Sequence, residues 1–325
     1  SEMLAELVKL DVWLGEAFAA AAGRVAESAG VSFERIEGIA SHGQTVAHHP
    51  EIGGSLQIGS PSIIAERTGC RVVADFRPRD LAAGGEGAPL APFFHHAVFT
   101  HEQEGRAILN LGGIANLTWL PARATARQVT AFDVGPANSL VDGVISLLSG
   151  ATEGMDRDGR RARAGRIHEE LLADLLADDY LDRPPPKSTG LERYGPAACE
   201  ELLQRWNDES GQRSTDDLLA TLVSFTAEAV GRAFREWLPQ AGECVDRVLV
   251  GGGGVHNPSM MSSLQNALPG LPIDLSDQHG VPAGAAEAMA FSLLGRNALL
   301  GIPNHLPNCT GAAREAVLGV VVPGR

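Results

Sequence analysis

Three short segments carry the glycine content that a nucleotide site requires. Residues 83–90, 110–116 and 251–254 each hold two or more glycines and each follows a predicted strand. Glycine lets the backbone approach a phosphate or a nucleobase more closely than other residues allow. None of the segments has the G-x-x-x-x-G-K-[ST] pattern, and 251–254 lacks the spacing of a dinucleotide fingerprint. Together they predict a nucleotide site of another kind, although each alone is equally typical of a tight turn.

Other candidate chemistries have weaker support in the sequence. The Ser-His-Gly run that begins at Ser41 lacks the G-x-S-x-G elbow of a serine hydrolase. The adjacent pairs His48–His49 and His95–His96 would point in diverging directions from a strand or a helix. The cysteines have neither C-x-x-C spacing nor a histidine at zinc-finger spacing. We therefore expect no hydrolase triad and no metal site, and we expect the thiols to be reduced.

The first third of the chain has the texture of an α/β domain. A helix is predicted up to Ala26, and short apolar runs predict strands at 36–40 and 71–75. The second strand leads into 76–90, which is predicted to be a loop because of its glycines. Loops of this kind often carry function.

After residue 105 a new series of short apolar runs begins, which predicts a second domain. Strands at 107–109 and 117–120 would form a hairpin around a Gly-Gly turn, and a further strand is predicted at 129–132. Asp133 would then lie at the carboxyl end of a strand. Asn138 would cap the next helix.

The rest of the second domain is predicted to be mainly helical. Helices are expected at 166–177 and 217–237, separated by a proline-rich stretch that includes 184–190 and is expected to be exposed or mobile. A strand at 245–250 runs into the glycines, and Asn257 followed by proline would begin a helix. Such units favour anionic ligands at the strand ends.

Composition excludes several classes of protein. A chain of 325 residues with 44% apolar residues is long enough for two packed domains. Its net charge of −14 opposes nucleic acid and anionic membrane surfaces, and no apolar run is long enough to span a bilayer. We expect a cytoplasmic protein with no nucleic-acid or membrane partner.

The motifs in their order along the chain resemble those of anhydro-N-acetylmuramic acid kinases. The resemblance covers essentially the whole chain and implies the α/β, two-domain actin-like fold of sugar kinases and Hsp70, with an interdomain cleft. The first domain would comprise 1–104 with 305–325, and the second 105–304. The matching motifs are Ser41-His-Gly-Gln-Thr45 with His48 and Pro50, Asp75-Phe-Arg77, Ala83-Gly-Gly-Glu-Gly-Ala-Pro-Leu90, Asn110-Leu-Gly-Gly-Ile-Ala-Asn116, Phe132-Asp-Val-Gly-Pro-Ala-Asn138, Lys187-Ser-Thr-Gly190, Gly252-Gly-Gly-Val-His-Asn257, Glu287 and Thr310-Gly-Ala312.

The resemblance also implies roles for individual residues. Asp133 matches the aspartate that activates the attacking water, whereas without the resemblance it would read as a turn or helix-capping residue. The residues implied to bind the nucleotide are Asn110, Gly112, Gly113, Asn116, Gly135, Gly251, Gly252, Gly253 and Asn257. The polar residues suited to the sugar are His42, Gln44, Thr45, Arg77, Asp80 and Glu287, of which Arg77 could pair with the lactyl carboxylate.

The implied reaction uses ATP with magnesium to open 1,6-anhydro-N-acetylmuramic acid and phosphorylate its O6. The implied role is the recycling of peptidoglycan, and the implied assembly is a homodimer. Two alternatives remain open: a non-catalytic sugar- or nucleotide-binding module, and a kinase that acts on another amino sugar or an ordinary hexose.

The sequence departs from the family pattern in several places. It lacks the G-T-S-x-D-G-[VI]-D hairpin that usually precedes S-H-G-Q-T, and donors in such hairpins stabilise a transition state by about 3 to 4 kcal/mol each. We therefore expect an uncovered sheet edge or apolar face in the first domain. Smaller departures, none of them at Asp133, are Glu86, Ala137, Leu191 and Gly284.

Overall fold

The structure is a computed structural model that describes residues 2–209, 214–238 and 244–325. It divides into two compact units: unit 1 is Ser1–Ala97 with Glu287–Arg325, and unit 2 is Val98–Ala286. Both unit boundaries lie earlier in the chain than the sequence placed them. The helix that follows residue 286 belongs with unit 1 because its Leu294 packs in one cluster with Val73.

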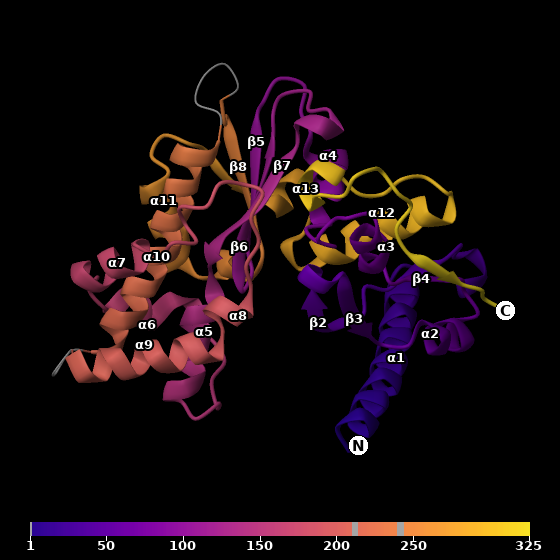
Figure 1. The fold of residues 1–325 in the computed structure, drawn as a ribbon, viewed down its shortest axis with the longest axis horizontal. Coiled ribbons are helices and arrows are strands. Elements are labelled where there is room, and N and C mark those ends of the chain that lie inside the picture. The colour runs from indigo at the N-terminus through magenta and orange to yellow at the C-terminus, as the bar shows by residue number, and fades with distance from the viewer. Residues whose placement is uncertain (1, 210–213, 239–243) are drawn as a thin grey trace. The chain divides into compact units, whose positions relative to one another are not determined.

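Unit 1 is a small α/β assembly with two sheets (Figure 1). Helix α4 crosses the unit boundary at its end. The elements in chain order are α1 (Glu2–Ser28), β1 (Ile39–Ala40), β2 (Gln44–His49), β3 (Gly54–Ile58), α2 (Pro61–Thr68), β4 (Val72–Ala74), α3 (Arg77–Ala82), α4 (Ala91–Phe99), α12 (Ala286–Leu299), α13 (Pro307–Thr310) and β10 (Val320–Val322).

The larger sheet of unit 1 has the strand order β1-β4-β10, with β1 parallel and β10 antiparallel to β4. Only Ile39 and Ala40 of the predicted strand 36–40 are in β1, and both are paired with β4. Among the described residues the other edge of β1 has no strand partner. A cavity of about 940 Å³ lies against β1, α1 and α12.

The segment 76–90 is not a simple loop, and this prediction was wrong in part. Its first residues form α3, with a proline in the first helical turn. The glycines follow the helix: Gly84 and Gly87 have φ of +86° and +71°, which favour glycine. Glycine content therefore located the turn after α3 but concealed the helix before it.

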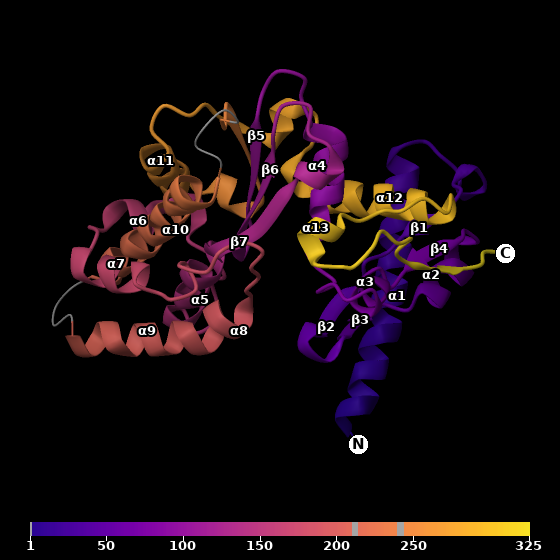
Figure 2. The same ribbon diagram turned by 45° about the horizontal axis from the view of Figure 1, so that its top comes forward.

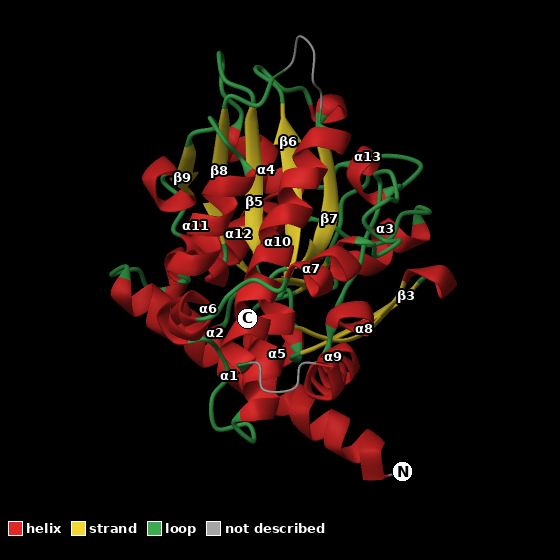
Figure 3. Ribbon diagram, turned by 90° about the vertical axis from the view of Figure 1, so that its left-hand side faces the viewer, coloured by secondary structure: helices red, strands yellow, loops and turns green. Residues whose placement is uncertain are grey.

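Unit 2 is built on a five-stranded sheet with the order β7-β6-β5-β8-β9 (Figure 3). The β7-β6-β5 strands are antiparallel neighbours, while β8 and β9 run parallel to β5. Its elements are β5 (Arg106–Leu111), β6 (Ile114–Leu120), β7 (Thr130–Pro136), α5 (Asn138–Leu148), α6 (Arg160–Ala164), α7 (Glu169–Leu176), α8 (Leu191–Tyr194), α9 (Pro196–Glu209), α10 (Thr215–Trp237), β8 (Arg247–Gly251), α11 (Pro258–Ala267) and β9 (Ile273–Leu275).

The predicted hairpin is confirmed and is longer than the sequence indicated. Strands β5 and β6 pair from Arg106 opposite Leu120 to Leu111 opposite Ala115, around a turn at Gly112 and Gly113. Strand β5 is central in the sheet, and its four apolar residues are buried while Arg106 and Asn110 are partly exposed. That burial explains its almost continuous apolar sequence.

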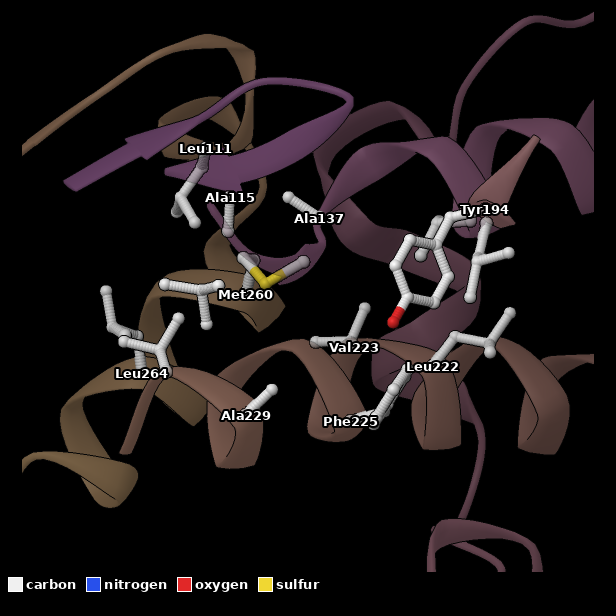
Figure 4. Close-up of a cluster of buried hydrophobic side chains, with 14 of the residues drawn as sticks. Leu111, Ala115, Ala137, Tyr194, Leu222, Val223, Phe225, Ala229, Met260 and Leu264 are labelled. Atoms are coloured by element: carbon white, nitrogen blue, oxygen red, sulfur yellow. The ribbon is translucent and has the colours of Figure 1, made fainter. Parts of the chain in front are cut away.

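Helix α10 runs through the core of unit 2 (Figure 4). Its residues from Leu218 to Phe234 are nearly all buried, as expected for a helix that is apolar around most of its circumference. The hydroxyl of Thr226 donates to the carbonyl of Pro136 at 3.0 Å, which ties α10 to the end of β7. The core therefore fixes the strand that carries Asp133.

Helix α9 was not predicted, because the proline-rich stretch before it masks the start of the pattern. It packs against α5, which follows β7 directly (Figure 2). Buried Cys199 of α9 and Gly143 of α5 meet so closely that a Cβ at Gly143 would lie 2.4 Å from the Cys199 Sγ.

All four cysteines are free, as predicted. In the described parts of the chain, no helix combines the length and the apolar character that a membrane span requires.

Candidate active site

Asp133 lies inside β7 and not at the end of a strand, so the predicted strand was too short. Strand β7 continues to Pro136 because its pairing with β6 continues, and Asp133 is opposite Asn116. The register shifts between Ala115 and Asn116, which is a bulge. Bulges are common beside active sites, where they redirect a side chain.

The segment from Lys187 to Thr189 holds Asp133 through its backbone and through its side chain. The amide of Thr189 and the hydroxyl of Ser188 donate to Asp133 Oδ2 at 3.0 and 3.2 Å. The amide of Asp133 donates to the carbonyl of Lys187 at 3.0 Å, and the hydroxyl of Tyr180 donates to the carbonyl of Asp133 at 2.8 Å. These hydrogen bonds fix both the backbone and the carboxylate of Asp133.

The sequence did not predict this contact. It assigned Lys187 to Gly190 to an exposed or mobile loop, yet Lys187 is half-buried. The available signal was the Lys-Ser-Thr-Gly motif, which matched the family but had no role attached to it. Ser188 and Thr189 are therefore site residues that sequence reasoning missed.

The Gly112–Gly113 turn is held against the start of α5 by Asn138. The Asn138 amide nitrogen Nδ2 donates to the carbonyls of Leu111 and Gly112 at 2.9 and 2.8 Å. The expected role of Asn138 as a helix cap was wrong, because it is the first residue of α5 and Ala137 stands at the cap. Its side chain fixes the hairpin turn instead.

The glycine loop after β8 packs directly on the end of β5. Gly252 has φ of +82°, and a Cβ there would lie 2.6 Å from Asn110 Oδ1 and 2.7 Å from the Leu111 carbonyl. At Gly254 it would lie 2.6 Å from the Leu111 side chain. The loop and the hairpin can approach this closely only because Gly252 and Gly254 have no side chain.

Asn257 begins α11, as the sequence predicted. Its side-chain oxygen accepts from the amides of Ser259 and Met260 at 3.0 and 3.1 Å. The side chain is buried beside Gly159, where a Cβ would lie 2.1 Å from Asn257 Oδ1. Its carboxamide oxygen is therefore committed to the helix cap.

Two buried hydroxyls beside these loops have no hydrogen-bond partner among the described residues. They are the Oγ atoms of Ser139, at the start of α5, and Ser276, after β9. A Cβ at Gly113 would lie 3.8 Å from the Ser139 Cβ, and one at Gly251 would lie 3.3 Å from the Ser276 Oγ. Buried polar groups are normally satisfied, so these hydroxyls suit a polar ligand such as a nucleotide.

In unit 1 the structure brings most of the predicted sugar residues to one cavity. His42, Gln44, Thr45, Arg77 and Glu287 all line the cavity of about 940 Å³. Their role as substrate ligands stays a prediction. The other walls are mainly apolar and come from α1 and α12.

His42 and Arg77 are hydrogen-bonded to each other in the polar part of the cavity lining. Arg77 Nε donates to His42 Nε2 at 3.1 Å, and Arg77 Nη1 donates to the Gly87 carbonyl at 2.8 Å. Burial, followed by the charge of Arg77, lowers the pKa of His42 to about 4. His42 is therefore neutral at physiological pH, with Nδ1 donating to the Gly43 carbonyl at 3.0 Å.

Asp80 is placed differently from the other predicted sugar residues, because its side chain is fully buried. Its Oδ1 accepts from His305 Nδ1 and the Thr310 hydroxyl at 2.6 and 2.7 Å, and its Oδ2 accepts from the Gly87 amide at 2.7 Å. His305 Nε2 accepts from the Ala316 amide at 2.9 Å, so the ring proton is on Nδ1. Asp80 thus joins the turn after α3 to the C-terminal segment.

We expect Asp80→Asn to lower the free energy of unfolding by about 1 to 3 kcal/mol at neutral pH. Either orientation of the new carboxamide places its NH₂ group against a donor. Burial alone would raise the pKa of Asp80, but hydrogen bonds from His305, Thr310 and Gly87 outweigh it and lower the pKa. The stability that this carboxylate contributes is therefore present above about pH 4 and lost as pH falls through the lowered pKa.

Denaturant unfolding at a series of pH values checks this expectation. Below pH 4 the free energy of unfolding should decrease less steeply with falling pH in Asp80→Asn than in the wild type. Glu66→Gln is the control, since that carboxylate is exposed and lies 3.9 Å from Arg325. Equal effects of the two substitutions would contradict the assignment of Asp80 to a buried network.

Comparison with known proteins identifies the family. The family model described as anhydro-N-acetylmuramic acid kinase matches residues 1–324. The chain belongs to the anhydro-N-acetylmuramic acid kinase family. The anhydro-N-acetylmuramic acid kinase of Salinibacter ruber is 41% identical over 333 residues, covering 100% of this chain and 83% of the relative. That of Acidithiobacillus ferrooxidans is 44% identical over 321 residues, covering 98% and 78%.

Likeness to solved structures is weaker. An activator of 2-hydroxyisocaproyl-CoA dehydratase from Clostridium difficile, with bound ADPNP, is 14% identical with a TM-score of 0.38, covering 78% of this chain and 90% of the other. The family assignment therefore rests on the sequence matches. The α/β class predicted from the sequence is confirmed, and the chain divides into two compact units.

Proposed function

We propose that this member of the family opens 1,6-anhydro-N-acetylmuramic acid and phosphorylates it with ATP. Water adds to the anomeric carbon, the bond from that carbon to O6 breaks, and O6 takes the γ-phosphoryl group. The products are N-acetylmuramic acid 6-phosphate and ADP. The observation that carries the proposal is Asp133, a carboxylate in the family's position that two donors of the Lys-Ser-Thr-Gly segment hold in place.

The proposed role of Asp133 is that of a general base, as in an inverting glycosidase. Asp133 accepts a proton from water as the water attacks. In a glycosidase a carboxylic acid protonates the leaving oxygen, whereas here phosphorus takes that position. The protein therefore needs one base and a nucleotide, and a second catalytic carboxylate is unnecessary.

The glycine loops of unit 2 are the proposed nucleotide site. The Gly112–Gly113 turn would hold phosphates, and the loop from Gly251 to Gly253 would lie against the adenosine. The unpartnered hydroxyls of Ser139 and Ser276 fit such a ligand. Magnesium bound with ATP would neutralise the charge that develops on the phosphates.

The wall of His42, Arg77 and Glu287 in unit 1 is the proposed sugar site. Arg77 carries a permanent charge and would pair with the lactyl carboxylate of the substrate. His42, kept neutral by burial and by Arg77, would position Arg77, because its Nε2 accepts from Arg77 Nε. We further propose a cytoplasmic homodimer that acts in peptidoglycan recycling.

The test is turnover of 1,6-anhydro-N-acetylmuramic acid with ATP and magnesium in ¹⁸O-labelled water, with the Salinibacter ruber relative as the positive control. The expected result is one labelled oxygen at the anomeric carbon of each phosphorylated product. Phosphorylation of an ordinary hexose without label would favour a conventional sugar kinase. Binding of the sugar without turnover, in a chain extended upstream by the family's G-T-S-x-D-G-[VI]-D hairpin as well as in this chain, would overturn the proposal.

A further inference from the structure

We propose that Lys187, Ser188 and Thr189 form a clamp that positions Asp133, and that the side chain of Lys187 anchors this clamp in a cage of aromatic rings. The inference rests on the proposed function, because the clamp affects turnover only if Asp133 is the catalytic base. In it Lys187 is a positioning residue that acts through Asp133.

The clamp binds both the backbone and the side chain of Asp133 to one segment of the chain. The Asp133 amide is bound to the Lys187 carbonyl, while the carboxylate is bound to the two residues that follow it. Three successive residues thus hold the backbone and the side chain together. Any displacement of this segment therefore displaces the carboxylate.

The Lys187 side chain extends into a cage formed by elements of unit 2. Its Nζ lies 4.8 Å from the ring centroid of Tyr180, 5.7 Å from that of Trp237 and 5.9 Å from that of Phe132. The ammonium also donates to the carbonyls of Tyr180 and Leu181 at 3.3 and 3.1 Å. An ammonium within about 6 Å of an aromatic face is attracted by the ring, and more strongly when it is shielded from water.

Tyr180 links the cage back to the base. Its ring forms the nearest wall of the cage, and its hydroxyl donates to the Asp133 carbonyl at 2.8 Å. The side chain is 1% exposed and packs edge-on against Tyr194. Asp133, Lys187 and Tyr180 therefore form a closed set of contacts, in which each member contacts the other two.

The charge of Lys187 changes with pH. Burial, followed by the charge of Arg232, lowers the pKa of Lys187 to about 8, while Glu236 and Asp182 oppose this and Arg183 adds to it. A lowered pKa means that the folded site favours the neutral amine, so deprotonation near pH 8 should leave the clamp in place and should not lower kcat.

The titration of Lys187 also acts on the free energy of unfolding. Between pH 8 and the ordinary lysine pKa near 10.4, the unfolded chain binds a proton at Lys187 that the folded chain does not. The contribution of Lys187 to the free energy of unfolding therefore rises with pH in this window.

Two matched pairs of variants test the clamp. Lys187→Met is compared with Lys9→Met, which changes an exposed lysine that pairs with Glu6. Tyr180→Phe is compared with Tyr194→Phe, which removes a hydroxyl that donates to Asp178. We expect Lys187→Met and Tyr180→Phe to lower kcat about 10- to 100-fold with little change in KM for ATP, because a base misplaced by about 1 Å costs this much.

A charge-keeping variant separates positioning from simple packing. Lys187→Arg should retain most of the wild-type kcat, since arginine keeps a long, charged side chain with donors for the carbonyls of Tyr180 and Leu181. Wild-type kcat in Lys187→Met and Tyr180→Phe would overturn the proposal, as would losses that the paired controls share. If the wild type does not turn over the anhydro sugar, the proposed function fails. If Asp133→Asn is fully active, Asp133 is not the base and the clamp fails with it; if only Asp133→Asn is inactive, the clamp alone fails.

Discussion

Asp133→Asn is expected to reduce kcat by about 10²- to 10⁴-fold, the range typical of removing a general base. The carboxamide has the shape of the carboxylate but cannot accept a proton from water. One of its orientations also places an NH₂ group against the Thr189 amide, which donates to Asp133 Oδ2 at 3.0 Å. The measurement is turnover of the anhydro sugar at saturating ATP.

The affinity for ATP should be unchanged in Asp133→Asn, because the glycine loops do not depend on this charge. Calorimetry with a non-hydrolysable ATP analogue checks this. Asp174→Asn is the control, since that carboxylate lies on α7 and pairs with Arg205 at the surface. Near-normal kcat in Asp133→Asn would remove Asp133 from the mechanism.

Gly252→Ala is expected to have the largest effect on the proposed nucleotide site. Alanine at φ of +82° is strained, and its Cβ would overlap Asn110 Oδ1 and the Leu111 carbonyl. Strain and overpacking each cost about 1 to 3 kcal/mol, so the free energy of unfolding should fall by about 2 to 6 kcal/mol. The loop can relieve the overlap only by moving away from the hairpin, so the Kd for ATP should rise at least 10-fold.

Gly270→Ala isolates the contribution of the close contact. Gly270 has φ of +81° and no atom within 4 Å of the position where its Cβ would lie, so alanine there carries the strain alone. We expect a loss of about 1 kcal/mol and an unchanged Kd for ATP. Equal losses of stability and affinity in the two variants would show that the contact between loop and hairpin does not shape the site.

The parts of the fold that follow local pattern could be predicted from the sequence. The β5–β6 hairpin, the α10 helix and the capping of α11 by Asn257 were all anticipated. Each depends on residues near one another in the chain: a Gly-Gly turn between apolar runs, a helical repeat, and an Asn-Pro pair. The glycine loops were recognised for the same reason.

The features that sequence reasoning missed depend on distant partners. Strand β7 extends past Asp133 because β6 pairs with it up to Pro136. The side chain of Asn138 does not cap the helix as expected, because it donates to the carbonyl of Gly112, 26 residues earlier in the chain. The stretch around Lys187 was predicted to be an exposed or mobile loop because prolines precede it. Its Ser188 and Thr189 nevertheless donate hydrogen bonds to Asp133, 55 and 56 residues earlier in the chain. Propensity carries no information about such pairings.

The sequence by itself determined the family, the α/β class and the glycine loops, because these are carried by residue type and short spacing. It also identified His42 and Arg77 as polar residues suited to a sugar, which the structure places together. Only the tertiary structure decided that Asp80 bonds His305 across 225 residues, and that Lys187 faces three aromatic rings. Those arrangements form when separate elements pack, since a buried charge must find its partners wherever the fold provides them.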